Sequence, residues 1–150
     1  MDIYDIKKDL ETRNTKHIIL DTDTYNEVDD QFALAYAALH PQINLLSVNA
    51  APFFNERAKS PRDGMEKSYA EIENILNLMN LSGSFPIYKG SDRFLAGERV
   101  PVDSPAARNI IKTAQGAEDI VYVVAIGAIT NVASALMLAP EIKDKIAVVW

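Results

Sequence analysis

The fold of this chain is decided by the stretch Ile18-Ile19-Leu20-Asp21-Thr22-Asp23-Thr24-Tyr25-Asn26-Glu27-Val28-Asp29-Asp30-Gln31-Phe32-Ala33-Leu34. Three apolar residues, typical of a buried strand, run into an acidic cluster, and a pattern with helical spacing starts at its far edge. The cluster puts five carboxylates into ten positions: Asp21, Asp23, Glu27, Asp29 and Asp30. No Lys or Arg occurs between Lys16 and Arg57, so the neighbouring sequence supplies no counter-charge. Carboxylates crowded in this way either take up protons or bind a cation.

We interpret the cluster as a divalent-metal site at the carboxyl end of a first strand. Its ligands would be oxygens and the chain has no cysteine, which favours a hard ion, Ca²⁺ or Mg²⁺, over zinc. The competing interpretation is a solvated acidic loop that caps a helix, because acids stabilise a helix N-terminus. Against it, the cluster has more acids than one cap needs. Asp21 and Asp23 also follow the apolar run directly, so we expect at least one of them to be partly buried.

The composition is that of a globular protein. The chain has 150 residues, 48% apolar and 24% charged, which is enough for one domain with a core. Its net charge of −6 argues against a nucleic-acid partner. Residues 1–16 are charged and lack the apolar core of a signal peptide, and no apolar run approaches the roughly 20 residues of a membrane span. We therefore expect a cytoplasmic protein with no membrane partner.

Strand and helix patterns alternate along the chain, which predicts an α/β fold with a largely parallel sheet and flanking helices. The expected strands are residues 17–22, 43–49, 85–88, 120–126 and from 146, and the expected helices are 28–39, 65–80, 104–114 and from 130 to Pro140. Residues 1–16 are expected to be a short helix or a loose arm. In such folds ligands bind beyond the carboxyl ends of the strands, where Asp21, Asp23, Asn49 and Ile126 fall.

Two further features of the pattern carry expectations. The helix at 28–39 has an apolar stripe at helical spacing, formed by Val28, Phe32, Ala35, Tyr36 and Leu39. The last residues, 146–150, read as the start of another buried strand. Because domain boundaries normally fall in exposed linkers, we expect residues 17–150 to be the N-terminal part of a longer domain that is incomplete at its C-terminus.

Three separated motifs resemble the nucleoside hydrolases of the inosine–uridine-preferring group. The first is the apolar strand leading into Asp21-x-Asp23 and then Asp29-Asp30. The second, residues 85–91, looks like the family's short strand and Gly turn, and the third, residues 123–133, looks like its strand, Gly and Leu-Thr-Asn helix start. The resemblance implies a Rossmann-like, nucleoside hydrolase-type fold. It also implies Ca²⁺-dependent hydrolysis of the N-glycosidic bond of ribonucleosides, to free base and ribose, in purine and pyrimidine salvage.

The same resemblance implies roles for residues of the acidic cluster. Asp23 would be the catalytic, metal-bound general base, and Asp30 and the main-chain carbonyl of Ile126 would be further metal ligands. Asp29 would bind the 2′ and 3′ hydroxyls of the ribose, and Asp21 would orient this shell. The implied partner is the nucleoside substrate, and a homo-oligomer is left open.

The sequence departs from the family pattern at two places. Five residues, in place of the usual three, separate Asp23 from the Asp-Asp pair, so the loop must take another path on which Asn26 or Glu27 could enter the site. After the second strand the family has Gly-Asn, whereas here Asn49 precedes two alanines, so this candidate substrate ligand is displaced. The remaining ligands normally lie in a second half that this chain lacks, and we expect the chain alone to be nearly inactive.

Two alternatives stay open. The Asp21-x-Asp23 motif after an apolar strand also resembles phosphatases of the haloacid-dehalogenase type, in which the first Asp is the nucleophile. That motif requires Thr or Val at the position of Tyr25, and it does not include the Asp-Asp pair. The other alternative is a non-catalytic metal- or nucleoside-binding module, or an inactive remnant. Ribose or nucleoside binding without turnover would favour it.

Overall fold

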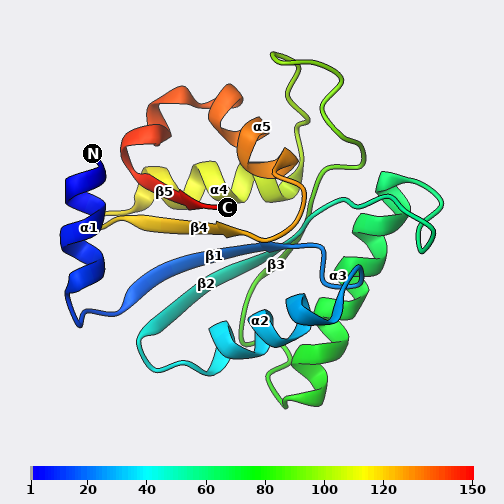
Figure 1. Cartoon of the computed structure of the whole chain (residues 1–150), viewed down its shortest axis with the longest axis horizontal. Coiled ribbons are helices and arrows are strands. Elements are labelled where there is room, and N and C mark those ends of the chain that lie inside the picture. The colour runs from blue at the N-terminus through cyan, green and yellow to red at the C-terminus, as the bar shows by residue number, and fades with distance from the viewer. Residues whose placement is uncertain (1) are drawn as a thin grey trace.

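Parallel strands form the centre of the structure, a computed structural model that describes residues 2–150 (Figure 1). Within that range the sheet has five strands in the order β3-β2-β1-β4-β5, and every neighbouring pair is parallel. The strands are β1 Lys16–Thr22, β2 Ile43–Ala50, β3 Ile87–Lys89, β4 Val121–Ala125 and β5 Ile146–Val149. The helices are α1 Ile3–Glu11, α2 Val28–Leu39, α3 Pro61–Leu78, α4 Pro105–Gly116, α5 Thr130–Leu138 and the 3₁₀ helix η1 Pro140–Asp144. The predicted fold class is confirmed.

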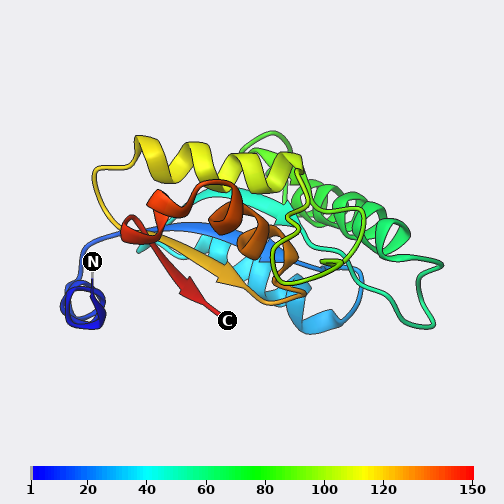
Figure 2. The same ribbon diagram turned by 90° about the horizontal axis from the view of Figure 1, so that it is seen from above.

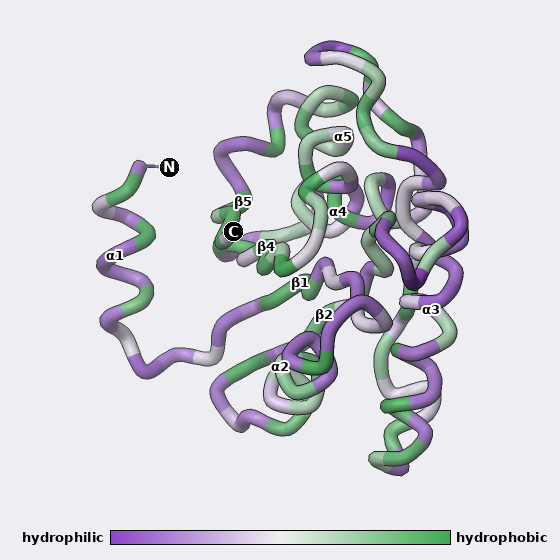
Figure 3. The backbone as a smooth tube through the Cα atoms, turned by 45° about the vertical axis from the view of Figure 1, so that its right-hand side comes forward, coloured by the Kyte–Doolittle hydropathy of each residue, from purple (hydrophilic) through white to green (hydrophobic). Residues whose placement is uncertain are grey.

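The helices cover the two faces of the sheet, with α4 and α5 on one side and α2 and α3 on the other (Figure 1). Figure 2 looks onto the side of α4 and α5. Successive side chains of a strand point to opposite faces, so Ile19 and Leu20 of β1 enter different cores. Ile19 packs with residues of α4 and α5, such as Ile110 and Val132, whereas Leu20 packs with Leu34 of α2 and neighbouring residues. In Figure 3 the hydrophobic colour accordingly follows the strands.

The strand order reverses direction beside β1, and this positions the site. The chain moves outward from β1 through β2 to β3, then returns through α4 to place β4 on the other side of β1. In open parallel sheets ligands bind at this switch point, beyond the carboxyl ends of the two strands. Here those ends are Thr22 of β1 and Ala125 of β4.

Helix α3 begins at Pro61, four residues earlier than the expected start at residue 65. Ser60 is its N-cap, and the Ser60 hydroxyl accepts a hydrogen bond from the Asp63 amide at 3.2 Å. Pro61 suits the first turn because its missing N–H has no partner there in any helix. Gly64 lets the first turn pack on the backbone of Phe53, because an added Cβ would lie 2.1 Å from the Phe53 carbonyl oxygen.

The apolar stripe of α2 lies on the surface. Phe32 is 72% exposed and Leu39 is 68% exposed, whereas the helix packs on the sheet through Leu34 and Ala37. The stripe borders a groove of about 910 Å³ whose floor includes Leu20 and other apolar residues of β1 and β4. A helical apolar stripe normally marks the buried face, so this surface is a departure from expectation.

The last strand is also less buried than expected. Val148, Val149 and Trp150 are exposed, and Trp150 is 80% exposed. The predicted strand is present and Ile146 and Ala147 are buried, but burial is wrong for Val148 and Val149, because within residues 2–150 β5 pairs with a strand on one side only. Pro140, predicted to end the preceding helix, follows α5 and begins η1.

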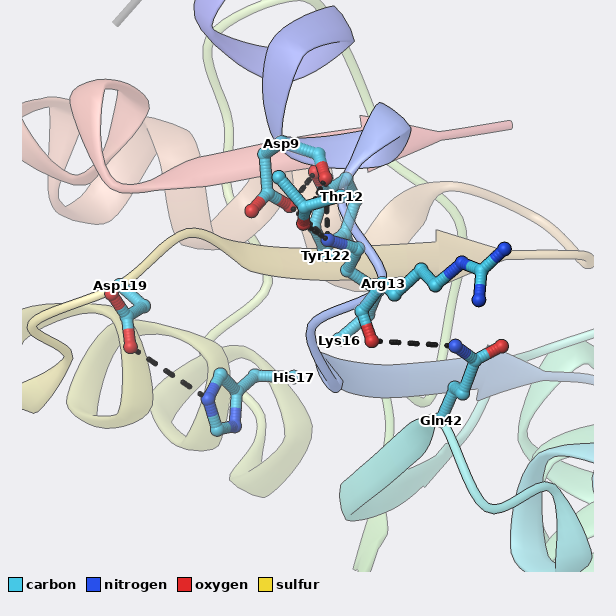
Figure 4. Close-up of polar contacts among 8 residues, drawn as sticks. All are labelled: Asp9, Thr12, Arg13, Lys16, His17, Gln42, Asp119 and Tyr122. Atoms are coloured by element: carbon cyan, nitrogen blue, oxygen red, sulfur yellow. Dashed lines mark hydrogen bonds and ion pairs between the residues drawn. The ribbon is translucent and has the colours of Figure 1, made fainter.

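Helix α1 stands at the amino end of the strands and is attached by polar contacts (Figure 4). The Tyr122 hydroxyl donates to the Asp9 carboxylate at 2.6 Å, and the Lys16 ammonium lies 3.1 Å from it. The Tyr122 hydrogen bond is the main cause that lowers the pKa of Asp9. His17 lies in the same region, 3.9 Å from Asp119. Among the helices of residues 2–150, none is long and apolar enough to cross a membrane.

Candidate functional site

The acidic residues gather where β1 meets β2 and β4. Asp21 lies opposite Asn49 of β2 and Ala125 of β4 in the strand register. The backbone amide of Ile126 donates to the carbonyl of Asp21 at 2.9 Å, which ties the ends of β1 and β4 together. The predicted residues Asp21, Asp23, Asn49 and Ile126 are therefore brought to the carboxyl edge of the sheet, at its switch point.

Asp21 is fully buried and is held by an asparagine from α5. Its Oδ2 accepts from the Asn131 amide at 3.0 Å. Its Oδ1 is buried with no hydrogen-bond partner within residues 2–150. Burial raises the pKa of Asp21 to about 7, against the hydrogen bond from Asn131, which lowers the pKa. A buried carboxylate oxygen without a donor is costly, so this residue has the capacity to orient a further polar group.

Asn49 lies beside Asp21 but is fully buried. Its Oδ1 accepts from Asn109 Nδ2 at 3.2 Å. Its amide lies near enough to Asp21 to lower the pKa of that carboxyl, yet Asn49 Nδ2 and Asp21 Oδ1 do not reach hydrogen-bond geometry. These contacts are those of a supporting residue, and a direct contact of Asn49 with substrate stays a prediction.

Asp23 is 6% exposed, just past the end of β1. Its Oδ2 accepts from the Asn26 amide at 3.0 Å. Its other oxygen lies close to Gly127, where an added Cβ would come within 2.5 Å of Oδ1. Burial is the main cause that raises the pKa of Asp23, and the Asn26 hydrogen bond opposes that rise. The carboxylate is thus fixed on both sides, and no other residue than glycine fits beside it without a shift.

Asp30 is the buried acid of α2. It is 6% exposed, and its Oδ1 accepts from the Thr22 hydroxyl at 2.6 Å. Burial raises the pKa of Asp30 to about 6, and the nearby Asp23 adds to the rise. The other predicted acids of this helix start, Asp29 and Glu27, are exposed. Asp29 is therefore open to solvent next to the buried Asp30, and Glu27 is the helix N-cap residue without a side-chain cap bond.

The donor set suits a hard cation but is incomplete. Asp23 and Asp30 offer carboxylate oxygens, and among residues 2–150 no Lys, Arg or His forms an ion pair with either of them. Ca²⁺ and Mg²⁺ prefer such oxygen ligands. In the same part of the chain, however, no three His, Asp or Glu side chains converge to hold a metal ion. The residues therefore fit part of a coordination shell.

Asn131 lies at the candidate site, although its position in the sequence predicts only the start of a helix. Its side chain is fully buried, donates to Asp21, and accepts from the backbone amide and hydroxyl of Ser91, each at 2.8 Å. Gly90 permits this contact, because an added Cβ there would lie 2.6 Å from Asn131 Nδ2. The available signal was the motif that contains Asn131, since a polar residue in an apolar helix start needs a buried partner.

The family model described as inosine–uridine preferring nucleoside hydrolase matches residues 18–150. Among solved structures, a plant nucleoside hydrolase has a TM-score of 0.64 at 18% identity, over 87% of this chain and 45% of its own. A purine-preferring ribonucleoside hydrolase from Gardnerella vaginalis has a TM-score of 0.64 at 26% identity, over 87% and 46%. An inosine–uridine preferring nucleoside hydrolase from Bacillus anthracis has a TM-score of 0.63 at 21% identity, over 91% and 50%.

The chain thus spans about half the length of these solved structures. Among curated proteins, none matches the chain.

Proposed function

The chain belongs to the inosine–uridine preferring nucleoside hydrolase family, and on that basis we propose that its acidic cluster is one half of an active site for nucleoside hydrolysis. The proposed reaction is the Ca²⁺-dependent cleavage of the N-glycosidic bond of a ribonucleoside into base and ribose. In this proposal residues 17–150 are the N-terminal part of the hydrolase domain, and residues 1–16 are an arm.

The observation that carries the proposal is the pair of buried acids at the switch point. Asp23 and Asp30 are each 6% exposed, and burial raises the pKa of both. Buried carboxylates without a cationic partner destabilise a protein unless they are protonated or bind a cation. Asp23, Asp30 and the carbonyl of Ile126 are the ligands we assign to the ion. When bound, Ca²⁺ supplies positive charge that holds and polarises a water molecule.

The chain's own residues divide the remaining work. Asp23 is the proposed base: its carboxylate is held by Asn26 and Gly127, so a proton acceptor is fixed in place. Asp29 is exposed at the start of α2, where it can accept from the vicinal hydroxyls of a ribose. Such an acceptor disfavours a 2′-deoxyribose, because one of the two hydroxyls that would donate to the carboxylate is missing. Asp21 and Asn131 support the shell from behind.

Protonation of the leaving base is not assigned to either histidine. His17 lies at the amino end of β1, and His40 follows the last residue of α2, where its ring lies 4.9 Å from that of Tyr36. Both places are remote from the carboxyl ends of the strands. We therefore expect turnover by this chain alone to be weak, while binding of the ion and of the ribose is the property to test.

The phosphatase alternative requires the first Asp of the motif as nucleophile. Asp21 holds that position and is 0% exposed, with one oxygen bonded to Asn131. A nucleophile must reach its substrate, so this burial favours the nucleoside reaction. The incomplete donor set favours a second candidate, a module that binds ion and nucleoside without turnover.

Isothermal titration of the 150-residue chain with CaCl₂ tests the proposal. We expect one site in the wild type and an affinity weaker by roughly tenfold or more in Asp23→Asn and Asp30→Asn, because each loses a charged ligand. Asp119→Asn is the matched control, since Asp119 is an exposed carboxylate beside His17 at the other end of the sheet. A wild type that binds no Ca²⁺, or two site variants that bind as well as the wild type, would remove the metal-site assignment.

A ribose titration in the presence of CaCl₂ then tests the substrate side. Asp29→Ala should lose ribose binding and keep its Ca²⁺ affinity. Unchanged ribose binding in Asp29→Ala would argue against the assigned role of Asp29. Hydrolysis of inosine and uridine by the same preparation separates the enzyme from the binding module: binding without turnover supports the module.

A further inference from the structure

One asparagine, Asn26, connects the loop between β1 and α2 to the loop that follows β2. Asn26 donates from Nδ2 to Asp23 Oδ2 at 3.0 Å, and its Oδ1 accepts from Asn55 Nδ2 at 2.7 Å. Its backbone amide also donates to the carbonyl of Asp23 at 2.7 Å, which closes a tight turn. The NH₂ group of Asn26 thus contacts the proposed base, and its amide oxygen contacts the loop after β2.

The second loop is itself anchored. The Arg57 guanidinium donates to the backbone carbonyl of Asn26, and the Arg57 amide donates to Asn55 Oδ1 at 2.9 Å. The Lys67 ammonium of α3 donates to the Arg57 carbonyl at 2.7 Å. We call Asn26, Asn55 and Arg57 the Asn26 bridge. It connects the carboxylate of Asp23 to α3. The contacts between its two loops join residues 29 and 31 positions apart in the chain.

The bridge fixes which end of the Asn26 amide faces Asp23. An asparagine side chain has a donor end and an acceptor end of nearly equal shape. With the acceptor end taken by Asn55, only the NH₂ group can face the carboxylate, and a rotated amide would set two oxygens against each other. Arg57 binds a backbone carbonyl and not an acid, so it holds the loop while leaving the negative charge of Asp23 available to a cation.

We propose that Asn26, oriented by Asn55 and Arg57, is a positioning residue that presents Asp23 to the divalent cation of the site. The loop that carries Asn55 and Arg57 then controls cation affinity without contacting the ion. This inference rests on the proposed function, because it takes Asp23 as a ligand. It gives a role to Asn26, which lies in the five-residue segment between Asp23 and the Asp-Asp pair.

Calcium titration of the 150-residue chain compares the wild type with Asn26→Ala and Asn55→Ala. Loss of a group that orients a metal ligand typically weakens affinity by roughly 10-fold to 100-fold, and we expect that range for Asn26→Ala. Asn55 contacts no acid, and Asn55→Ala leaves Asn26 in place, so we expect a smaller fall in Ca²⁺ affinity for this variant. If Asn26→Ala does not fold, Asn55→Ala still decides the outcome. Asn74→Ala is the matched control, since exposed Asn74 also donates to a carboxylate, that of Glu71 at 3.3 Å.

A second readout separates positioning from a general loss of structure. Urea unfolding of the ion-free chain should keep a cooperative transition in Asn26→Ala and Asn55→Ala, because both side chains lie on loops outside the helices and strands. A fall in Ca²⁺ affinity in these variants then reports the position of Asp23. Wild-type affinity in both Asn26→Ala and Asn55→Ala would overturn the inference and leave the metal site standing. A wild type that binds no Ca²⁺ would overturn the proposed function, and this inference with it.

Discussion

The Asp21 carboxylate and the Asn131 amide lie 3.0 Å apart although 110 positions separate them in the chain. Both side chains are fully buried, and the contact joins the end of β1 to the first turn of α5. It also lies at the centre of a wider network, because Asn131 accepts from Ser91 in the segment after β3. One asparagine therefore holds three segments of the carboxyl edge together.

Asn131→Ala should destabilise the protein by about 2–4 kcal/mol, because it leaves buried groups of Asp21 and Ser91 without partners. At this chain length each kcal/mol lowers Tm by about 2–4 °C, so calorimetry will detect the change. Asn77→Ala is the control: Asn77 is exposed and bonds Ser82, and its loss should cost under about 0.5 kcal/mol. Equal Tm values for the two variants would refute the role of Asn131.

Gly127→Ala should displace the Asp23 carboxylate. The new Cβ would lie 2.5 Å from Asp23 Oδ1 and 3.1 Å from the Asp23 amide nitrogen. We expect Ca²⁺ affinity to fall roughly tenfold or more, as for other losses of ligand orientation. Gly97→Ala is matched to it, because a Cβ at Gly97 meets no heavy atom within 4 Å. Titration calorimetry on both variants is the measurement, and unchanged affinity in Gly127→Ala would contradict the described packing.

Stability without divalent ions should fall as the pH rises from about 4 to 7. Burial raises the pKa of Asp21 to about 7 and of Asp30 to about 6, from the ordinary value of 3.8. The folded chain therefore keeps protons that the unfolded chain has already lost in this interval, and that stabilisation disappears as the pH passes the folded pKa values. The lowered pKa of Asp9 acts with the opposite sign, but below about pH 4.

Thermal unfolding in EDTA between pH 4.5 and 8 tests this dependence. The Tm should drop by several degrees, since each kcal/mol corresponds to about 2–4 °C. Asp21→Asn should remove much of the slope, and CaCl₂ should raise Tm more at pH 7.5 than at pH 5. A Tm that rises from pH 5 to 7.5 in EDTA would count against buried, unpaired acids.

Phe32→Ala and Phe53→Ala should differ widely in stability. Phe32 is 72% exposed on α2, whereas Phe53 is 4% exposed. Truncating a buried phenylalanine costs about 3–5 kcal/mol, while an exposed one should change the free energy of unfolding by about 0.5 kcal/mol or less. Urea titrations of both variants give the comparison. A large loss for Phe32→Ala would mean that the stripe of α2 is covered in solution.

The sequence was sufficient for the elements and their class. Helix α2 begins and ends at the predicted residues, 28 and 39, and the apolar run at 120–126 is β4 with one residue fewer at each end. These patterns are local: a strand covered on both faces is apolar throughout, and a helix repeats every 3.6 residues. The Pro61 start of α3 was missed because proline reads equally as a loop breaker and as a first-turn residue.

The position of the candidate residues in the fold was predictable, but their contacts were not. The cluster at 21–30 marks the carboxyl end of β1 by its position in the chain. The pairing of Asp21 with Asn131, and of Asn26 with Asn55, depends on which loops meet in space, and no local pattern encodes that. For the same reason the periodicity of α2 identifies an apolar face but not what, if anything, packs on it.

The indole of Trp150 donates from Nε1 to the carbonyl of Gly127 at 3.3 Å. Gly127 is the residue against which the Asp23 carboxylate packs, and the chain contains a single tryptophan. The ultraviolet fluorescence of this protein therefore comes largely from Trp150, which contacts Gly127, the residue that packs against the proposed base. A ligand that moves Asp23 should change the wavelength or intensity of this emission, so intrinsic tryptophan fluorescence can report binding at the site.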